Sequence, residues 1–417
     1  MPGDNENSPK RLVVLAVGNT KPVMQFQQLL DNDSYPAQDP AQAWNALTIG
    51  GYTDLDQIRG AGYEDWTHLA GVGELSPHSR TSVDWGTRAP IKPELMLEAG
   101  NRAVSPSRRD IVTLDSLCLL STGRDVAAAP LVPFHATSAA TAQAARMAAQ
   151  LTAAHPDYWP ETIRALMVHS AEYTEPMKAL FAAETNLRNR YDIARRFGYG
   201  VLDIDRATAS ARDHLALIAQ TDIQPYRLEG TRKFNECHYY TLPLPAAVLE
   251  ELDNEIVDLK ITLSYFVDPN PGFAANVDPL RYQSFGLRFD LRRKGELLAN
   301  FKRRVNAAER DVRTQRAPRH PDDNRWLLGP DSISAGSLHC DTWSGPAVDL
   351  LGRDVLCIKP VGGWWRDRAR AAIVNQRARY ALVVTLKARR TDIDLYTPIV
   401  LSITPGQAVR NEVLVER

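Results

Sequence analysis

The apolar residues in the first half of the chain fall into short continuous runs, separated by polar stretches rich in proline and glycine. These runs cover residues 12–17, 44–52, 91–97 and 115–121. Such runs are typical of strands that are buried on both faces of a parallel sheet. Helical patterns cover residues 138–154, 161–170 and 204–219. Strands that alternate with helices predict an α/β fold with a partial parallel sheet flanked by helices.

The pattern changes after about residue 222. Residues 257–264 and 285–291 alternate apolar and polar side chains with a period of two, as strands with one buried face do. Further strand candidates cover residues 355–361, 380–386 and 395–403, and a short helix is indicated at 245–252. Several short alternating strands joined by loops predict a mostly antiparallel β-sandwich.

These patterns predict three parts of the chain. Residues 1–10 form a polar tail, residues 11–222 form the α/β domain, and residues 223–417 form the β-sandwich domain. The strongly charged stretch at 293–325 is interpreted as a mobile loop of the second domain.

Composition narrows the classes of function. The 417 residues carry a formal net charge of −1, which gives no electrostatic reason to expect nucleic acid or an anionic membrane as a partner. There is no apolar run of about 18 residues, and the polar residues 1–10 do not resemble a signal peptide. We therefore expect a cytoplasmic protein.

The four cysteines form no C-x-x-C pair, and Cys118 and Cys357 lie inside apolar runs. Buried free thiols are expected there, rather than a disulfide or a zinc site. No metal and no cofactor are expected.

Ser138 is the candidate for chemistry. An apolar strand end at 131–134 leads into a turn of small residues, and an alanine-rich helix follows. A hydroxyl at such a helix start lies where free N–H groups and the helix dipole favour negative charge. The alternative is a serine that only caps the helix. Asn19, after the first strand, is a second candidate, and a plain turn at Gly18-Asn19 is its alternative.

Several short motifs resemble the subtilisin-like serine peptidases, the subtilases, in the right order over residues 11–210. The nucleophile motif Gly-Thr-Ser-x-Ala matches residues 136–140, with Ala136 in place of glycine and Ala142 in place of a later proline. The strand ending in Ala-Gly-Asn matches residues 16–19. Further matches are Leu75–Arg80, Lys92–Glu94 and Gly198–Gly200. Residues 160–166 and 361–365 resemble bacterial intracellular subtilases with a C-terminal β-domain, some of which are encoded beside AAA-type ATPases.

The resemblance implies a serine endopeptidase that forms an acyl-enzyme. Ser138 is implied as the nucleophile and Asn19 as the oxyanion donor, together with the Ser138 N–H. Ala16, Val17 and Gly18 are implied to line one wall of the substrate pocket.

The rest of the catalytic triad does not appear in the sequence. In subtilases the triad runs Asp, His, Ser along the chain, and no His-Gly-Thr or Asp-Ser-Gly motif occurs here. The Asp and His are therefore expected from an upstream segment, or from a partner that supplies the N-terminal half of the peptidase domain. His135 is a weak substitute base, with turn packing favoured for it. His68 and His78 are interpreted as solvated surface residues.

Two alternatives remain. In the first, the chain is an inactive pseudopeptidase or scaffold whose β-sandwich binds a protein such as an AAA-type ATPase. Trp364 and Trp365 could form an exposed anchor for such a partner, and core packing is the alternative for this pair. In the second, the chain is a truncated gene product.

Overall fold

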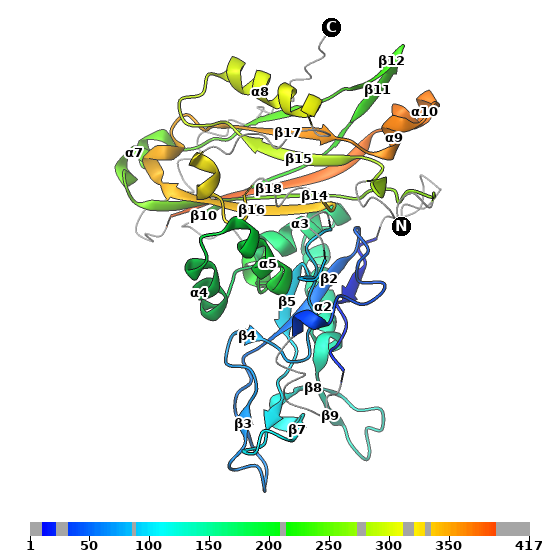
Figure 1. Cartoon of the computed structure of the whole chain (residues 1–417), viewed down its shortest axis with the longest axis vertical. Coiled ribbons are helices and arrows are strands. Elements are labelled where there is room, and N and C mark those ends of the chain that lie inside the picture. Colours follow the sequence, from blue (N-terminus) through cyan, green and yellow to red (C-terminus); the bar gives the residue numbers. More distant parts are fainter. Residues whose placement is uncertain are drawn as a thin grey trace. The chain divides into compact units, whose positions relative to one another are not determined.

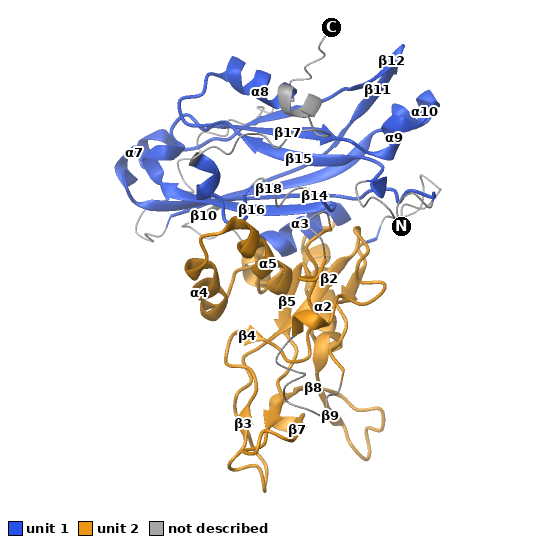
Figure 2. Cartoon of the chain, in the orientation of Figure 1, with its two compact units in different colours: residues 1–11, 157–169, 208–417 blue, residues 12–156, 170–207 orange. Residues whose placement is uncertain are grey.

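The computed structural model describes residues 11–21, 32–85, 89–208, 214–272, 281–311, 321–329 and 335–388. They form two compact units, coloured separately in Figure 2. Residues 12–156 and 170–207 belong to the first, here called the α/β unit. Residues 157–169 and those from 208 onward belong to the second, here called the β-sandwich unit.

The α/β unit is built on a small parallel sheet. Strand β1 (Val14–Ala16) pairs in parallel with β2 (Leu47–Thr53), and β2 pairs in parallel with β5 (Leu95–Glu98). The short strand β4 (Glu74–Leu75) runs antiparallel to the end of β2. Leu47, Ile49 and Leu95 are fully buried, as the continuous apolar runs predict. The predicted parallel sheet is therefore confirmed.

Helix α2 (Ala136–Ala154) contacts all three parallel strands. Its buried face is made of small side chains, including Ala139, Ala140 and Ala144. Small side chains let a helix axis come close to a sheet, so the alanine-rich sequence explains this packing. The Gln143 side chain adds a hydrogen bond of 2.9 Å to the carbonyl of Glu98 in β5.

Shorter elements complete the α/β unit. They are the sheet of β3 (Thr67–His68), β6 (Ala103–Val104) and β7 (Ile111–Val112), the hairpin of β8 (Leu119–Thr122) and β9 (Leu131–Phe134), and the helices α4 (Glu175–Ala183), α5 (Leu187–Phe197) and α6 (Ile204–Thr208). The 3-10 helices η1 (Asn32–Ser34) and η2 (Asp115–Leu117) lie in its loops.

The β-sandwich unit contains two antiparallel sheets, which confirms the predicted fold class. One has the order β10 (His214–Ile223), β18 (Ala378–Ala388), β14 (Ile256–Tyr265), β16 (Leu338–Pro346). The other has the order β13 (His238–Thr241), β17 (Val355–Val361), β15 (Gly286–Leu291). Figure 1 shows these sheets stacked between helices α8 (Leu298–Asp311) and α3 (Pro160–Ser170). A ribbon of β11 (Tyr226–Glu229) and β12 (Thr231–Phe234) and the helix α7 (Ala246–Leu252) complete the layers.

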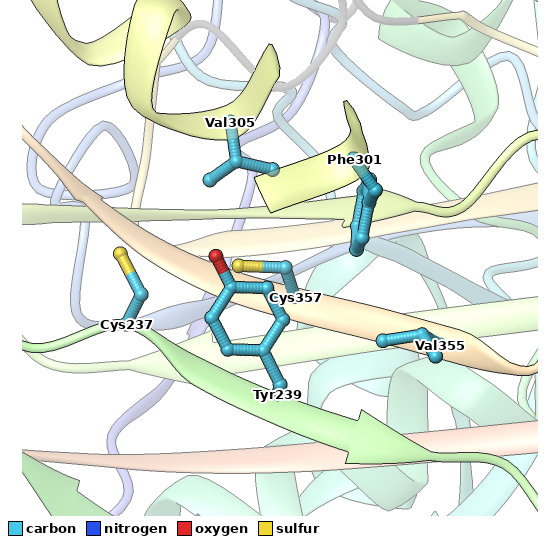
Figure 3. Close-up of a cluster of buried hydrophobic side chains, with 6 residues drawn as sticks. All are labelled: Cys237, Tyr239, Phe301, Val305, Val355 and Cys357. Carbon is cyan, nitrogen blue, oxygen red and sulfur yellow. The ribbon is translucent and has the colours of Figure 1, made fainter. Parts of the chain in front are cut away.

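Helix α8 covers the outer face of the three-stranded sheet. Its side chains Phe301 and Val305 are fully buried against Tyr239 on β13 and Cys357 on β17, as Figure 3 shows. Tyr239 and Cys357 are direct neighbours in the antiparallel register. The stretch 293–325, expected to be a loop, therefore contains a helix, which packs on the sheet through these two apolar residues and through the ion pair of Arg304 with Asp290 of β15.

Helix α3 packs on the four-stranded sheet and brings a charged side chain, Arg164, into its interface. Ala165 and Leu166 contact Ala381 and Val383 of β18. Arg164 is fully buried and donates hydrogen bonds of 2.6 Å to the Tyr265 carbonyl and 2.7 Å to the Ser337 carbonyl.

Two expectations are wrong. The helix predicted over residues 204–219 ends at Thr208, and strand β10 begins at His214. The second is the loop at 293–325, which contains helix α8. Of the two alternatives for the Trp364–Trp365 pair, in helix α9 (Trp364–Asp367), core packing applies to Trp365, which is buried with its ring 5.1 Å from that of Phe285, whereas Trp364 is half-buried. The strand predicted at 395–403 lies outside the described residues.

None of the helices in the described part of the chain has the length and apolar character needed to cross a bilayer.

Candidate active site at the start of helix α2

The two residues singled out by the sequence meet through a third residue, Thr137. The Asn19 side-chain oxygen accepts a hydrogen bond of 3.0 Å from the Thr137 backbone N–H and one of 2.6 Å from the Thr137 hydroxyl. A backbone N–H is only a donor, so the Asn19 oxygen must be the atom that faces it. The orientation of the Asn19 amide is thereby fixed, and its NH₂ group faces away from Thr137.

That NH₂ group is available to a ligand. Within the described residues it has no hydrogen-bond partner, and Asn19 is only partly buried. Its backbone is held firmly, because the Asn19 carbonyl accepts a bond of 2.7 Å from Arg80 and the next residue, Thr20, donates to the carbonyls of His78 and Pro77. The loop after β1 thus presents one oriented amide donor.

Ser138 is the third residue of helix α2 and its side chain is exposed, whereas Thr137 and Ala139 on either side are buried. The backbone N–H groups in the first turn of a helix have no acceptor carbonyl within the helix, so they can donate to other acceptors. The Ala136 N–H donates to the Ala99 carbonyl at 2.7 Å and the Thr137 N–H to Asn19. In the described structure the Ser138 hydroxyl itself has no hydrogen-bond partner.

The residue before this turn adopts an unusual backbone. Ala136 has a φ of +67°, in the left-handed region that favours glycine. The Ala136 backbone is fixed there because its N–H binds Ala99 and the next N–H binds Asn19. The departure from the Gly-Thr-Ser motif noted in the sequence therefore falls at a position where glycine would be less strained.

The three residues expected to line a substrate pocket lie at the end of β1. Ala16 and Gly18 are half-buried, whereas the Val17 side chain is fully buried. The Val17 N–H donates to the Ile49 carbonyl and its own carbonyl accepts from Gln38, so this residue is part of the scaffold. Gly18 has a φ of +100°, and a Cβ there would lie 2.7 Å from the Gln38 Cβ, which explains the glycine.

Two histidines lie together beside the turn that carries Ser138. The rings of His78 and His135 have centroids 4.9 Å apart, and His78 Nδ1 lies 3.2 Å from a guanidinium nitrogen of Arg102. His135 also approaches the Cys118 sulfur at 3.7 Å. The His78 side chain is buried and its Nε2 has no partner within the described structure, which corrects its interpretation as a surface residue.

Electrostatics keep both rings neutral. Burial, the Arg102 guanidinium and the second histidine lower the pKa of His78 to about 3. Burial and Arg102 also lower the pKa of His135. His135 is thus unprotonated at neutral pH, yet its Nδ1 faces Cys118 and its ring packs on His78, which is the packing role favoured for it.

An apolar hairpin leads directly into the site. Strands β8 and β9 pair only with each other among the described strands, and β9 ends one residue before the N-cap residue His135. One face of the hairpin carries Leu120 and Leu131, which are 72% and 58% exposed, and the connecting loop carries Val126, which is 72% exposed. This apolar face was not anticipated, because the sequence pattern alone does not say which strands pair in isolation.

Sequence comparisons agree with the motifs. Residues 3–200 match the model of the subtilase family. No curated protein matches the chain.

Solved structures that resemble the chain include MycP1 from Mycobacterium smegmatis (17% identity, TM-score 0.26, covering 48% of this chain and 42% of that chain). Others are the subtilase cytotoxin SubAB (16%, TM-score 0.25, 48% of each chain) and a serine protease of Aeromonas sobria (12%, TM-score 0.22, 86% and 67%). The chain thus spans about half the length of the first two.

The strained backbone of Ala136 is testable by substitution with glycine. Ala136 and Ala139 are both buried, but only Ala136 has a positive φ. Ala139→Gly lowers the free energy of unfolding by about 1 kcal/mol through lost helix propensity. Ala136→Gly is expected to be more stable than Ala139→Gly by about 1–2 kcal/mol, because it relieves the left-handed strain. Urea unfolding of the two variants checks this, and equal losses would contradict it.

The buried His78 predicts a loss of stability in acid. Its pKa is lower in the folded chain (about 3) than its ordinary 6.5, so the unfolded chain binds the extra proton and stability falls as the pH drops below 6.5. Between pH 7 and pH 5 this residue is expected to cost about 2 kcal/mol. Urea unfolding at both pH values should show a smaller loss for His78→Gln than for the parent. The exposed His68→Gln should keep the parent's loss, and a His78→Gln variant that does so too would refute the assignment.

Proposed function

Residues 3–200 belong to the subtilase family, and we propose that they form the nucleophile-bearing part of a serine endopeptidase. The observation that carries the proposal is the pair of hydrogen bonds from Thr137 to Asn19. They place an oriented, unused amide donor beside the residue that precedes an exposed serine at a helix start. A serine that merely caps a helix requires no such donor.

In the proposed reaction the Ser138 oxygen attacks the carbonyl carbon of a peptide bond. The new C–O bond forms, the carbonyl oxygen becomes an oxyanion, and the Asn19 NH₂ and the Ser138 N–H donate hydrogen bonds to it. The C–N bond then breaks and leaves an acyl-enzyme, which water hydrolyses. The proton that Ser138 loses passes through a base to the leaving amine.

Within the described residues, no histidine base contacts the Ser138 hydroxyl, and no aspartate is placed to orient such a base. We propose that a histidine and an aspartate come from polypeptide outside residues 11–388, either an upstream segment or a separate partner. Strand β1 supports this, because among the described strands it pairs with β2 alone, and Val13 beside it is 44% exposed. An open strand edge of this kind favours pairing with a further strand.

The hairpin of β8 and β9 offers the same segment an apolar surface. A two-stranded hairpin is only marginally stable by itself. Leu120 and Leu131, which are exposed to water, contribute no hydrophobic burial that would stabilise it. Because the hairpin runs directly into the Ser138 turn, a segment that covers it also stands beside the nucleophile. We therefore assign this face to the segment that supplies the histidine.

A pseudopeptidase or scaffold remains the alternative, because the Ser138 hydroxyl has no base in the described structure. In that case the β-sandwich unit would bind a protein partner such as an AAA-type ATPase. Of its suggested aromatic anchor, Trp365 is buried and Trp364 is half-buried. A location in the cytoplasm, and the absence of nucleic-acid and membrane partners, stay predictions under either function.

A fluorophosphonate probe, which reacts with activated serines, distinguishes these functions. The chain alone is expected to show little labelling and little peptide hydrolysis, because Ser138 lacks a base. Adding the product of the upstream coding sequence should give labelling at Ser138 that Ser138→Ala abolishes and the exposed-site control Ser107→Ala does not. Asn19→Ala in the same complex should slow labelling by about 10²–10³, the cost of removing one oxyanion donor.

Two outcomes would contradict the proposal. Labelling of Ser138 at full rate in the chain alone would mean that the base lies within it. Absence of labelling in every combination would favour the scaffold.

A further inference from the structure

The β-sandwich unit contains a polar cavity that the proposed peptidase function does not use. It has a volume of about 650 Å³ and lies at the loop before α8, the 3-10 helix η5 (Pro321–Arg325) and the segment that begins at the 3-10 helix η7 (Ala347–Leu350). Four cationic side chains line it: Arg293, Lys294, Arg325 and Arg353. The cavity is called the arginine cavity below.

Carboxylates balance only part of this positive charge. Arg353 and Asp322 form a largely buried ion pair joined by two hydrogen bonds. Asp349, in contrast, serves two cations, because one of its oxygens lies 2.6 Å from Lys294 and the other 2.7 Å from Arg325. This part of the lining therefore carries one more positive charge than negative.

Arg293 adds a further cation to the lining. Its backbone N–H donates a hydrogen bond of 3.0 Å to the Glu296 carboxylate, and its guanidinium acts on that carboxylate through its charge, which helps to lower the pKa of Glu296. The Glu296 carboxylate also pairs with Arg304, at 2.9 Å. The lining as a whole carries four cations and three carboxylates, which leaves a surplus of one positive charge.

The cations are held in place yet accessible. Trp343 is fully buried beneath them, with the Arg325 and Arg353 guanidinium carbons 5.7 Å and 5.1 Å from the centre of its ring. A Cβ on Gly345 would lie 2.2 Å from an Arg325 nitrogen, so the glycine makes room for this arginine. The side chains of Lys294 and Arg325 remain 49% and 36% exposed. A cation that is already oriented loses little conformational entropy when it binds an anion.

We propose that the arginine cavity binds a doubly charged oxyanion, the phosphate group of a phosphate monoester, through Arg293, Arg325 and Lys294. The cations of the lining outnumber its carboxylates, and planar guanidinium groups donate paired hydrogen bonds to phosphate oxygens. The site is independent of Ser138 and of the proposed peptidase function, because all of its residues belong to the β-sandwich unit.

The test is calorimetric titration of the full chain at low ionic strength with inorganic phosphate and, separately, with adenosine monophosphate. One saturable site is expected for both ligands. Arg293→Ala and Arg325→Ala should each weaken binding about tenfold or more, the cost of losing a charged hydrogen bond. Arg232→Ala should bind as the parent does, because this exposed arginine lies on β12 of the same unit and not in the cavity lining.

Arg293→Ala keeps the test informative if Arg325→Ala fails to fold, since the Arg293 guanidinium makes no hydrogen bond or ion pair within the described residues. Tighter binding of the nucleotide than of phosphate would identify an organic monoester as the ligand, and equal binding would identify phosphate alone. Absence of saturable binding, or equal binding by the parent and Arg293→Ala, would overturn the proposal.

Discussion

The hydrogen bonds between Asn19 and Thr137 join the end of strand β1 to the start of helix α2 across 118 positions of sequence. They do three things at once. They satisfy an N–H group that the helix start leaves open, they set which way the Asn19 amide faces, and they fix the turn that carries Ser138. The same contact therefore helps to position both candidate catalytic groups.

The surrounding structure is arranged to keep that contact. Alanines on α2 let the helix lie close to the parallel sheet, which brings its first turn level with the strand end. Gly18 allows the chain to turn sharply after β1 without a clash with Gln38. Ala136 accepts a left-handed backbone so that consecutive N–H groups reach Ala99 and Asn19. Strain at one residue beside a reacting group is a common feature of functional sites.

Much of the fold was predictable from the sequence, and the features that were missed have physical causes. Continuous apolar runs indicated the parallel strands, because burial on both faces leaves no room for polar residues. The histidine pair escaped prediction, because the sequence around His78 is polar and only the fold buries it against Arg102 and His135. Residues 214–219 were mistaken for the end of a helix, because a short apolar stretch fits the period of a helix or of a strand, and it is the pairing with β18 that makes it a strand. Helix α8 was hidden by its many charges, because one of the contacts that hold it to the sheet, the pairing of Arg304 with Asp290 of β15, does not show in an apolar pattern.

The central claim is that Thr137 and Asn19 act as one unit, and a double-mutant cycle on the free energy of unfolding tests it most directly. Asn19→Ala removes the acceptor, and Thr137→Val removes the hydroxyl donor while keeping the shape of the side chain. If the contact is present, the two losses are not additive, and the coupling between them is about 1 kcal/mol. Losses that add fully would show that Asn19 is not oriented by Thr137, and would contradict this account of the site.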